Sequence, residues 1–135
     1  MEGKERRKPR ILVADDEEPV VRIVSVNLEI EGYEVIPAYD GVEAWEKIKK
    51  EKPDLVILDI MMPEMDGWEV LRRMKADPEL RDIPAIMLTA LAQAHDIATS
   101  WETGADSHLV KPFDPLELVT LVRRLLGTRG EGEGS

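Results

Sequence analysis

The sequence contains no cysteine and only 2 histidines among its 135 residues. Without cysteine there is no disulfide framework, no thiolate-ligated zinc or iron–sulfur site and no cysteine nucleophile. The two histidines, His95 and His108, are too few for a histidine-rich metal site. With 43% hydrophobic and 34% charged residues, the composition is typical of one globular domain that buries its own core.

Positive charge is scarce outside the N-terminus. The chain carries 18 basic and 28 acidic side chains, a net charge of −10. The first ten residues carry +3, which leaves −13 on residues 11–135. A region this acidic repels nucleic acid phosphates and attracts cations. We therefore expect no direct DNA or RNA binding by this chain.

Long hydrophobic runs are absent as well. No apolar run approaches the ~18 residues that a membrane span needs. The basic N-terminus is not followed by the apolar segment of a signal peptide. We therefore expect a cytoplasmic protein with no membrane insertion.

Two polar tails flank one compact region. Residues 1–9 are predicted to form a basic flexible N-terminal tail, and residues 10–127 form the folded domain. Gly127 is predicted to end the last helix. Residues 128–135, rich in Gly and Glu, are predicted to be a flexible tail or linker stub.

Short apolar runs alternate with helical patterns inside the folded region. These runs have little polar alternation, which is typical of parallel strands covered on both faces. They are Ile11–Ala14, Glu34–Tyr39, Leu55–Leu58, Ala85–Leu88 and Ser107–Val110. The alternation predicts an α/β fold of (βα)₅ type, in which a five-stranded, doubly wound parallel sheet carries helices on both faces.

The first helix is the ambiguous one, because apolar residues alternate over Val24–Ile30 as they would in a strand. The preceding acids with Pro19, and the following Gly32, favour a helix. Asp66 and Asp114 are predicted N-caps of later helices. The predicted inward faces are Val42, Trp45 and Ile48; Val70, Leu71 and Met74; Ala94, Ile97, Ala98 and Trp101; and Leu118, Val119, Val122, Leu125 and Leu126.

Two other sets of large side chains are also assigned to core packing rather than to a ligand site. They are Trp45, Trp68 and Trp101, and Met61, Met62 and Met65, which are expected to fill gaps.

Chemically active side chains follow the predicted strands, at the sheet edge where such folds bind ligands. Asp15 and Asp16 follow the first strand, Asp59 the third, Thr89 the fourth and Lys111 the fifth. Clustered carboxylates repel one another, and oxygen ligands without sulfur or imidazole favour Mg²⁺. One carboxylate beside such an ion could attack a phosphoryl group and form an acyl phosphate.

In these residues the sequence resembles the receiver domain of bacterial two-component response regulators, a flavodoxin-like fold. The resemblance covers roughly residues 10–127 in the right order and spacing. It is carried by Asp15-Asp16, Leu58–Gly67, Thr89-Ala90, Gly104–Asp106 and Lys111–Phe113.

The resemblance implies a phosphoacceptor and a Mg²⁺ site. Asp59 resembles the phosphoacceptor. Asp16 resembles the acid that binds the ion directly, together with Asp59 and the backbone carbonyl of Met61. Asp15 resembles the acid that holds the water ligands of the ion.

The resemblance also implies three switch elements. Thr89 resembles the hydroxyl that moves toward the phosphoryl group, and Lys111 resembles the cation that pairs with the acceptor. The Lys111–Pro112 peptide is similar to one that is cis in this family. His108 stands where the family usually has Tyr or Phe, and Leu91 stands at a position that varies in the family. We interpret His108 either as a packing ring or as a titratable switch.

The leading hypothesis is a phosphorylation-dependent switch rather than an enzyme with its own substrate. A sensor histidine kinase or phosphotransfer protein would phosphorylate Asp59. The surface of the fourth helix, the fifth strand and the fifth helix, including Leu116 and Leu121, would then bind an unidentified output partner. The chain would be a stand-alone receiver or a fragment of a longer regulator.

Plainer alternatives remain at this stage. Taken singly, the acids at residues 15–18 could cap a helix, Thr89 could be a strand residue and Lys111 could be solvated. A receiver-like scaffold that works without phosphorylation is the main alternative. A flavin or nucleotide protein of the same fold is disfavoured, because four acids occupy the place of a phosphate loop. An aspartyl phosphatase is disfavoured because Met61 stands where it would need a second acid.

Overall fold

The computed structural model describes residues 8–90 and 104–134, with side chains up to Gly127. Five parallel strands form one sheet in the order β2-β1-β3-β4-β5. The strands are β1 (Arg10–Ala14), β2 (Glu34–Ala38), β3 (Leu55–Asp59), β4 (Ala85–Ala90) and β5 (Ser107–Lys111). The predicted doubly wound α/β sheet is confirmed, and each strand bound lies within two residues of its prediction.

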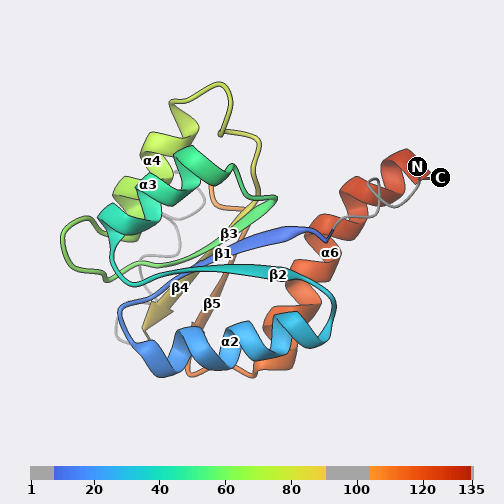
Figure 1. The fold of residues 1–135 in the computed structure, drawn as a ribbon, viewed down its shortest axis with the longest axis horizontal. Helices are drawn as coiled ribbons and strands as arrows, with labels where there is room; N and C mark the ends of the chain where they lie inside the picture. The colour runs from blue at the N-terminus through green and yellow to red at the C-terminus, as the bar shows by residue number, and fades with distance from the viewer. Residues whose placement is uncertain (1–7, 91–103, 135) are drawn as a thin grey trace.

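Helices cover both faces of this sheet. Figure 1 shows α3 (Gly41–Glu51) and α4 (Gly67–Lys75) on one face, and α2 (Glu18–Ile30) and α6 (Pro115–Gly134) on the other. The ambiguous first segment is therefore a helix. The predicted helix that carries Ala94, Ile97, Ala98 and Trp101 lies outside the described residues, as do residues 1–7 of the predicted N-terminal tail.

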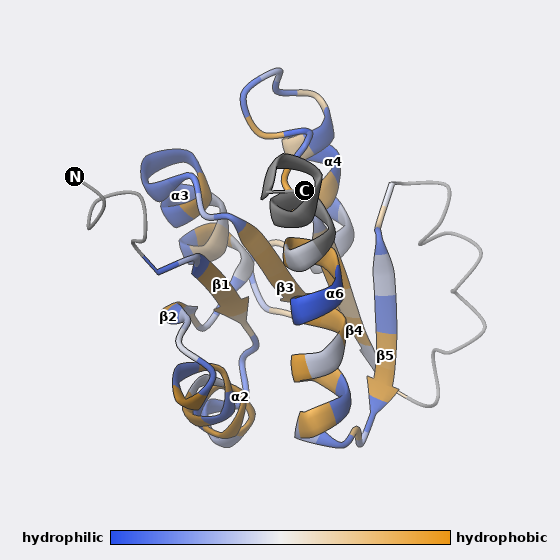
Figure 2. Cartoon of the chain, turned by 90° about the vertical axis from the view of Figure 1, so that its right-hand side faces the viewer, coloured by the Kyte–Doolittle hydropathy of each residue, from blue (hydrophilic) through white to orange (hydrophobic). Residues whose placement is uncertain are grey.

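The sheet separates two apolar cores. Alternate residues of one strand serve opposite faces: Leu12 packs under α3 and α4, whereas Ile11 and Val13 pack under α2 and α6. In Figure 2 the central strands β1, β3 and β4 are hydrophobic over most of their length. Burial on both faces fixes the register, because a slip of one residue would exchange the two sets of side chains.

The predicted helix caps are present in the structure. Asp66 accepts the Glu69 N–H at 2.9 Å, and Asp114 accepts the Leu116 N–H at 2.9 Å. The inward face of α4 is buried as predicted, since Val70, Leu71 and Met74 have no exposed area. The predicted face of α6 is buried over its first turns, whereas Leu125 and Leu126 are partly buried. These caps fix the starts of two helices beside the carboxyl edge of the sheet.

Two packing predictions and one predicted helix end were wrong. Val42 is 41% exposed, because the inward face of α3 is made by Ala44 and Ile48, with Trp45 at its margin. Met61 is 57% exposed instead of filling a gap, whereas Met62 is buried. The last helix does not stop at Gly127. It continues to Gly134, and Gly127 lacks the left-handed φ that would end a helix there. Most of the predicted flexible tail is therefore helical.

No described helix is both long and apolar enough to cross a membrane. A cytoplasmic location stays a prediction.

Gly32 ends α2 at the edge of the sheet opposite to the carboxyl ends of the strands. Its φ is +98°, its N–H donates to the Glu29 carbonyl at 3.0 Å, and the Tyr33 N–H donates to the Leu28 carbonyl at 3.1 Å. This is the pattern by which a glycine after the last helical residue closes a helix.

We predict that Gly32→Ala lowers the free energy of unfolding by about 1 kcal/mol, because an L side chain is strained at this φ. No atom lies within 4 Å of the added methyl group, so no clash contributes. Urea unfolding measures the change. Gly127→Ala, which is also uncrowded but helical, is the control and should not lose stability. Equal stability of Gly32→Ala and wild type would contradict the strain argument.

Candidate functional site

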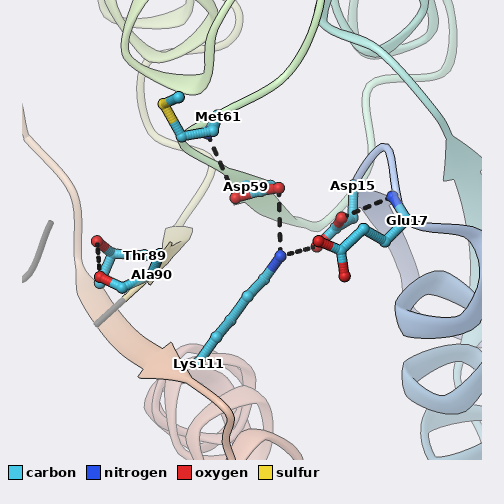
Figure 3. Close-up of polar contacts among 7 residues, drawn as sticks. All are labelled: Asp15, Glu17, Asp59, Met61, Thr89, Ala90 and Lys111. Atoms are coloured by element: carbon cyan, nitrogen blue, oxygen red, sulfur yellow. Dashed lines mark hydrogen bonds and ion pairs between the residues drawn. The ribbon is translucent and has the colours of Figure 1, made fainter. Parts of the chain in front are cut away.

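The carboxyl edge of the sheet brings together three charged side chains from separate strands. Asp15 follows β1, and Asp59 and Lys111 are the last residues of β3 and β5. Figure 3 shows the Lys111 ammonium between the two carboxylates. Its Nζ lies 2.7 Å from Asp15 Oδ2 and 3.3 Å from Asp59 Oδ2. Residues nearly a hundred positions apart therefore share one site.

Both carboxylates are buried, Asp15 completely and Asp59 to 4% exposure. Backbone N–H groups hold their second oxygens. Glu17 N–H donates to Asp15 Oδ1 at 2.9 Å, and Met61 N–H donates to Asp59 Oδ1 at 3.3 Å. These contacts leave the Oδ2 atoms of both carboxylates facing Lys111.

Burial governs the protonation of Asp59. Desolvation, helped by the negative charge of Asp15, raises the pKa of Asp59 to about 7, although Lys111 and the Met61 N–H oppose the rise. Burial alone would lower the pKa of Lys111. The contact with Asp15 and the negative charges of both carboxylates outweigh it, so the pKa of Lys111 is raised. Lys111 is therefore a permanent cation at neutral pH, and Asp59 is a carboxyl group whose ionised form is costly.

The acids after β1 form a group with the chemistry of a divalent cation site. Carboxylate oxygens of Asp15, Asp16 and Glu17 lie within 4.8 Å of one another. The buried Asp15 Oδ2 is paired with the Lys111 ammonium, 2.7 Å away. An all-oxygen donor set of clustered carboxylates, balanced by a single ammonium, fits Mg²⁺. Glu17 was not among the predicted ligands. Its position directly after Asp15 and Asp16 in the sequence could have identified it as a candidate.

The predicted switch residues lie in the two strands at one side of the sheet, Thr89 in β4 and His108 in β5. The Thr89 side chain is buried, and its hydroxyl donates to the Ala90 carbonyl at 3.2 Å, apart from the carboxylates (Figure 3). His108 lies within β5 and pairs with Met87 of β4 in the sheet register. Leu91 and His95 lie outside the described residues. The Lys111–Pro112 peptide is cis, as the resemblance implied.

The comparisons with known proteins fit this geometry. A family model described as the response regulator receiver domain matches residues 11–123. The chain belongs to this family. It is similar to the solved structure of the chemotaxis response regulator CheY4 of Vibrio cholerae, with a TM-score of 0.81, 33% identity and coverage of 87% of this chain and 98% of that one.

Two curated relatives of this receiver domain are transcriptional regulators. The chain is 44% identical to the "DNA-binding dual master transcriptional regulator RpaA" of Synechocystis, over 87% of this chain and 49% of that protein. It is also 44% identical to the "alkaline phosphatase synthesis transcriptional regulatory protein PhoP" of Bacillus subtilis, over 87% of this chain and 48% of that protein. The receiver domain thus spans about half the length of the curated relatives that it matches.

These relatives correct the expectation about nucleic acid. The acidic composition predicted no direct DNA binding by this chain, yet RpaA, which shares this domain, is named as DNA-binding. The physical reason is that net charge describes only the sequence over which it is counted. An acidic receiver domain can form part of a regulator that binds DNA.

The raised pKa of Asp59 predicts a pH-dependent effect of removing its charge. An acid whose pKa rises from 3.8 to about 7 on folding favours the native state when protonated. This contribution is complete below pH ~4 and is lost as the pH rises through ~7. In Mg²⁺-free buffer Asp59→Asn should therefore raise the free energy of unfolding at pH 8, on the order of 2 kcal/mol, and much less at pH 5.

Urea unfolding at both pH values measures this difference. Asp82→Asn, which changes an exposed carboxylate, is the matched control and should show no such pH dependence. An equal gain for Asp59→Asn at pH 5 and pH 8 would mean that the cause is not the titration of the carboxyl group.

Proposed function

We propose that this receiver domain is a phosphorylation-dependent switch in which Asp59 accepts a phosphoryl group from the phosphohistidine of a sensor histidine kinase. The observation that carries the proposal is the contact of the buried Asp59 carboxylate with Lys111, beside a group of acids suited to a divalent cation. Membership of the receiver family supports the assignment to two-component signalling.

The reaction is a transfer between two residues. A carboxylate oxygen of Asp59 attacks phosphorus, the bond from phosphorus to the histidine nitrogen breaks, and the imidazole leaves with the bonding electron pair. The product is an acyl phosphate on Asp59. Asp59 must be ionised to attack, and its raised pKa disfavours the ionised form. A nearby cation would favour the carboxylate and so increase the ionised fraction.

A Mg²⁺ ion fits the acids at this site. Asp15, Asp16 and Asp59, with the carbonyl of Met61, are the proposed residues that hold it, and Glu17 lies beside them. When bound, the ion supplies positive charge that neutralises the oxygens of the transferring group.

The remaining residues act on the product of the transfer. The ammonium of Lys111, already 3.3 Å from Asp59 Oδ2, pairs with a phosphoryl oxygen. The Thr89 hydroxyl leaves the Ala90 carbonyl, to which it donates at 3.2 Å, and donates to the phosphoryl group instead. Its movement, together with that of His108, changes the surface that includes β5 and the exposed Leu116 of α6. Leu121, the other residue expected there, is partly buried against the core.

The curated relatives favour one use of the switch. Since RpaA and PhoP are named as transcriptional regulators, we propose that this receiver controls a DNA-binding regulator of that kind. Phosphorylation of Asp59 would then regulate transcription.

The first test is the intact mass of the protein after incubation with acetyl phosphate, with and without Mg²⁺. We expect one phosphoryl adduct that requires Mg²⁺ and is absent in Asp59→Asn. Asp16→Asn should need more Mg²⁺ for the same rate, whereas the exposed Asp82→Asn should behave as wild type. No adduct with any small phosphodonor or kinase would favour the scaffold alternative. An adduct that persists in Asp59→Asn would identify a different acceptor.

A second prediction concerns His108. We expect His108→Tyr to be phosphorylated at the wild-type rate, because the proposed transfer uses the carboxylate of Asp59 and the cations beside it, and His108 lies three residues before Lys111 in β5. The same mass measurement over time tests this. Loss of phosphoryl uptake in His108→Tyr would place this ring within the chemical centre.

A further inference from the structure

Two helix N-termini enclose the loop between β3 and α4, residues 60–66. This loop carries Met61, whose N–H donates to Asp59 Oδ1 at 3.3 Å. On one side, Gly67 at the start of α4 donates its N–H to the Ile60 carbonyl at 2.9 Å. On the other side, Gly41 at the start of α3 donates its N–H to the Pro63 carbonyl at 3.3 Å. Helix α3 belongs to a distant part of the sequence, so this second contact is purely tertiary.

Both glycines touch backbone atoms so closely that no side chain fits. A Cβ atom on Gly41 would lie 1.6 Å from the Met65 carbonyl oxygen and 2.5 Å from its carbon. A Cβ atom on Gly67 would lie 2.4 Å from the carbonyl oxygen of Asp59 itself. Gly41 lies in a helix and has no left-handed φ. Alanine would suit its backbone conformation, so the requirement for glycine at this position is one of space alone.

The loop that these glycines enclose is strained. Glu64 has a φ of 73°, which is uncommon for a residue with a side chain. The Met65 N–H donates to the Pro63 carbonyl at 2.7 Å and closes a tight turn around Glu64. A conformation of this kind persists only where the surroundings hold it. The contact with Gly41 is such a constraint, since it falls on the same Pro63 carbonyl and on Met65.

We propose that Gly41 is a positioning residue for phosphoryl transfer. Because it has no side chain, the start of α3 packs directly against the β3–α4 loop, and this contact holds Met61 and Asp59 in position. This inference rests on the proposed function. The start of α3 is better anchored than the loop. Asp40 accepts the Glu43 N–H at 2.7 Å, and Ala44 and Ile48 are fully buried. The loop is less anchored, because Met61, Pro63 and Glu64 are exposed. An added methyl group therefore displaces the loop.

The test is Gly41→Ala, with Gly32→Ala as the matched control. Both add one methyl group to a glycine. Gly32, however, lies at the opposite edge of the sheet with no atom within 4 Å of the new Cβ, and its substitution costs stability through φ alone. We expect phosphorylation of Gly41→Ala by acetyl phosphate at saturating Mg²⁺ to slow by about ten- to a hundredfold, the scale of a misplacement near 1 Å. Gly32→Ala should keep the wild-type rate while it remains folded.

Amide NMR spectra supply a readout that does not depend on the reaction. The Met61 and Asp59 amide signals should shift in Gly41→Ala and stay in place in Gly32→Ala. An unchanged rate in folded Gly41→Ala, or an equal loss in Gly32→Ala at matched stability, would overturn the proposal. If wild type accepts no phosphoryl group, the proposed function fails. The shifts of the Met61 and Asp59 signals then decide whether Gly41 positions the loop.

If Gly41→Ala does not fold, the same substitution is tested in a second variant, Glu64→Gly. Glu64→Gly relieves the left-handed φ at the turn without adding atoms, so it should stabilise the loop and preserve the rate. Gly41→Ala is then introduced into Glu64→Gly, and the same loss of rate relative to Glu64→Gly is expected. A wild-type rate in this double variant would also overturn the proposal.

Discussion

The cost of burying two carboxylates at one edge of a sheet is the constraint on which the rest of this structure depends. Asp15 and Asp59 are removed from water and point at the same space. Without a counter-charge each would cost several kcal/mol. Lys111 supplies that charge internally, but one ammonium does not balance two carboxylates, and the pKa of Asp59 is raised to about 7. The residual negative charge of this site favours the binding of a further cation.

The fold meets this constraint by placing the charges at the ends of buried strands. Asp59 and Lys111 end strands whose register is fixed by apolar cores on both faces. The proposed switch requires such anchoring, because phosphorylation has to move some groups while the reacting atoms stay in place.

The sequence predicted what local pattern determines and missed what only packing determines. Buried apolar runs followed by acids located β1 and β3 and brought Asp15, Asp59 and Lys111 to one edge. The same helical periodicity misjudged Val42, since nearby Ala44 and Ile48 already cover the sheet. The requirement for glycine at position 41 could not be predicted, because the obstacle is the Met65 carbonyl, brought there by the fold and not by the local sequence.

The acidic composition of the chain gives limited information about its partners. Part of the excess negative charge belongs to the site, where Asp15, Asp16 and Glu17 gather. Acids in surface ion pairs, such as Glu43 with Lys47 at 2.9 Å, are balanced by their partners and add nothing to that excess. The acids at the site form a donor set that fits a divalent cation at the carboxyl edge. Under the proposed function they would serve the receiver whatever it is linked to, so their negative charge gives no information about the output of the regulator.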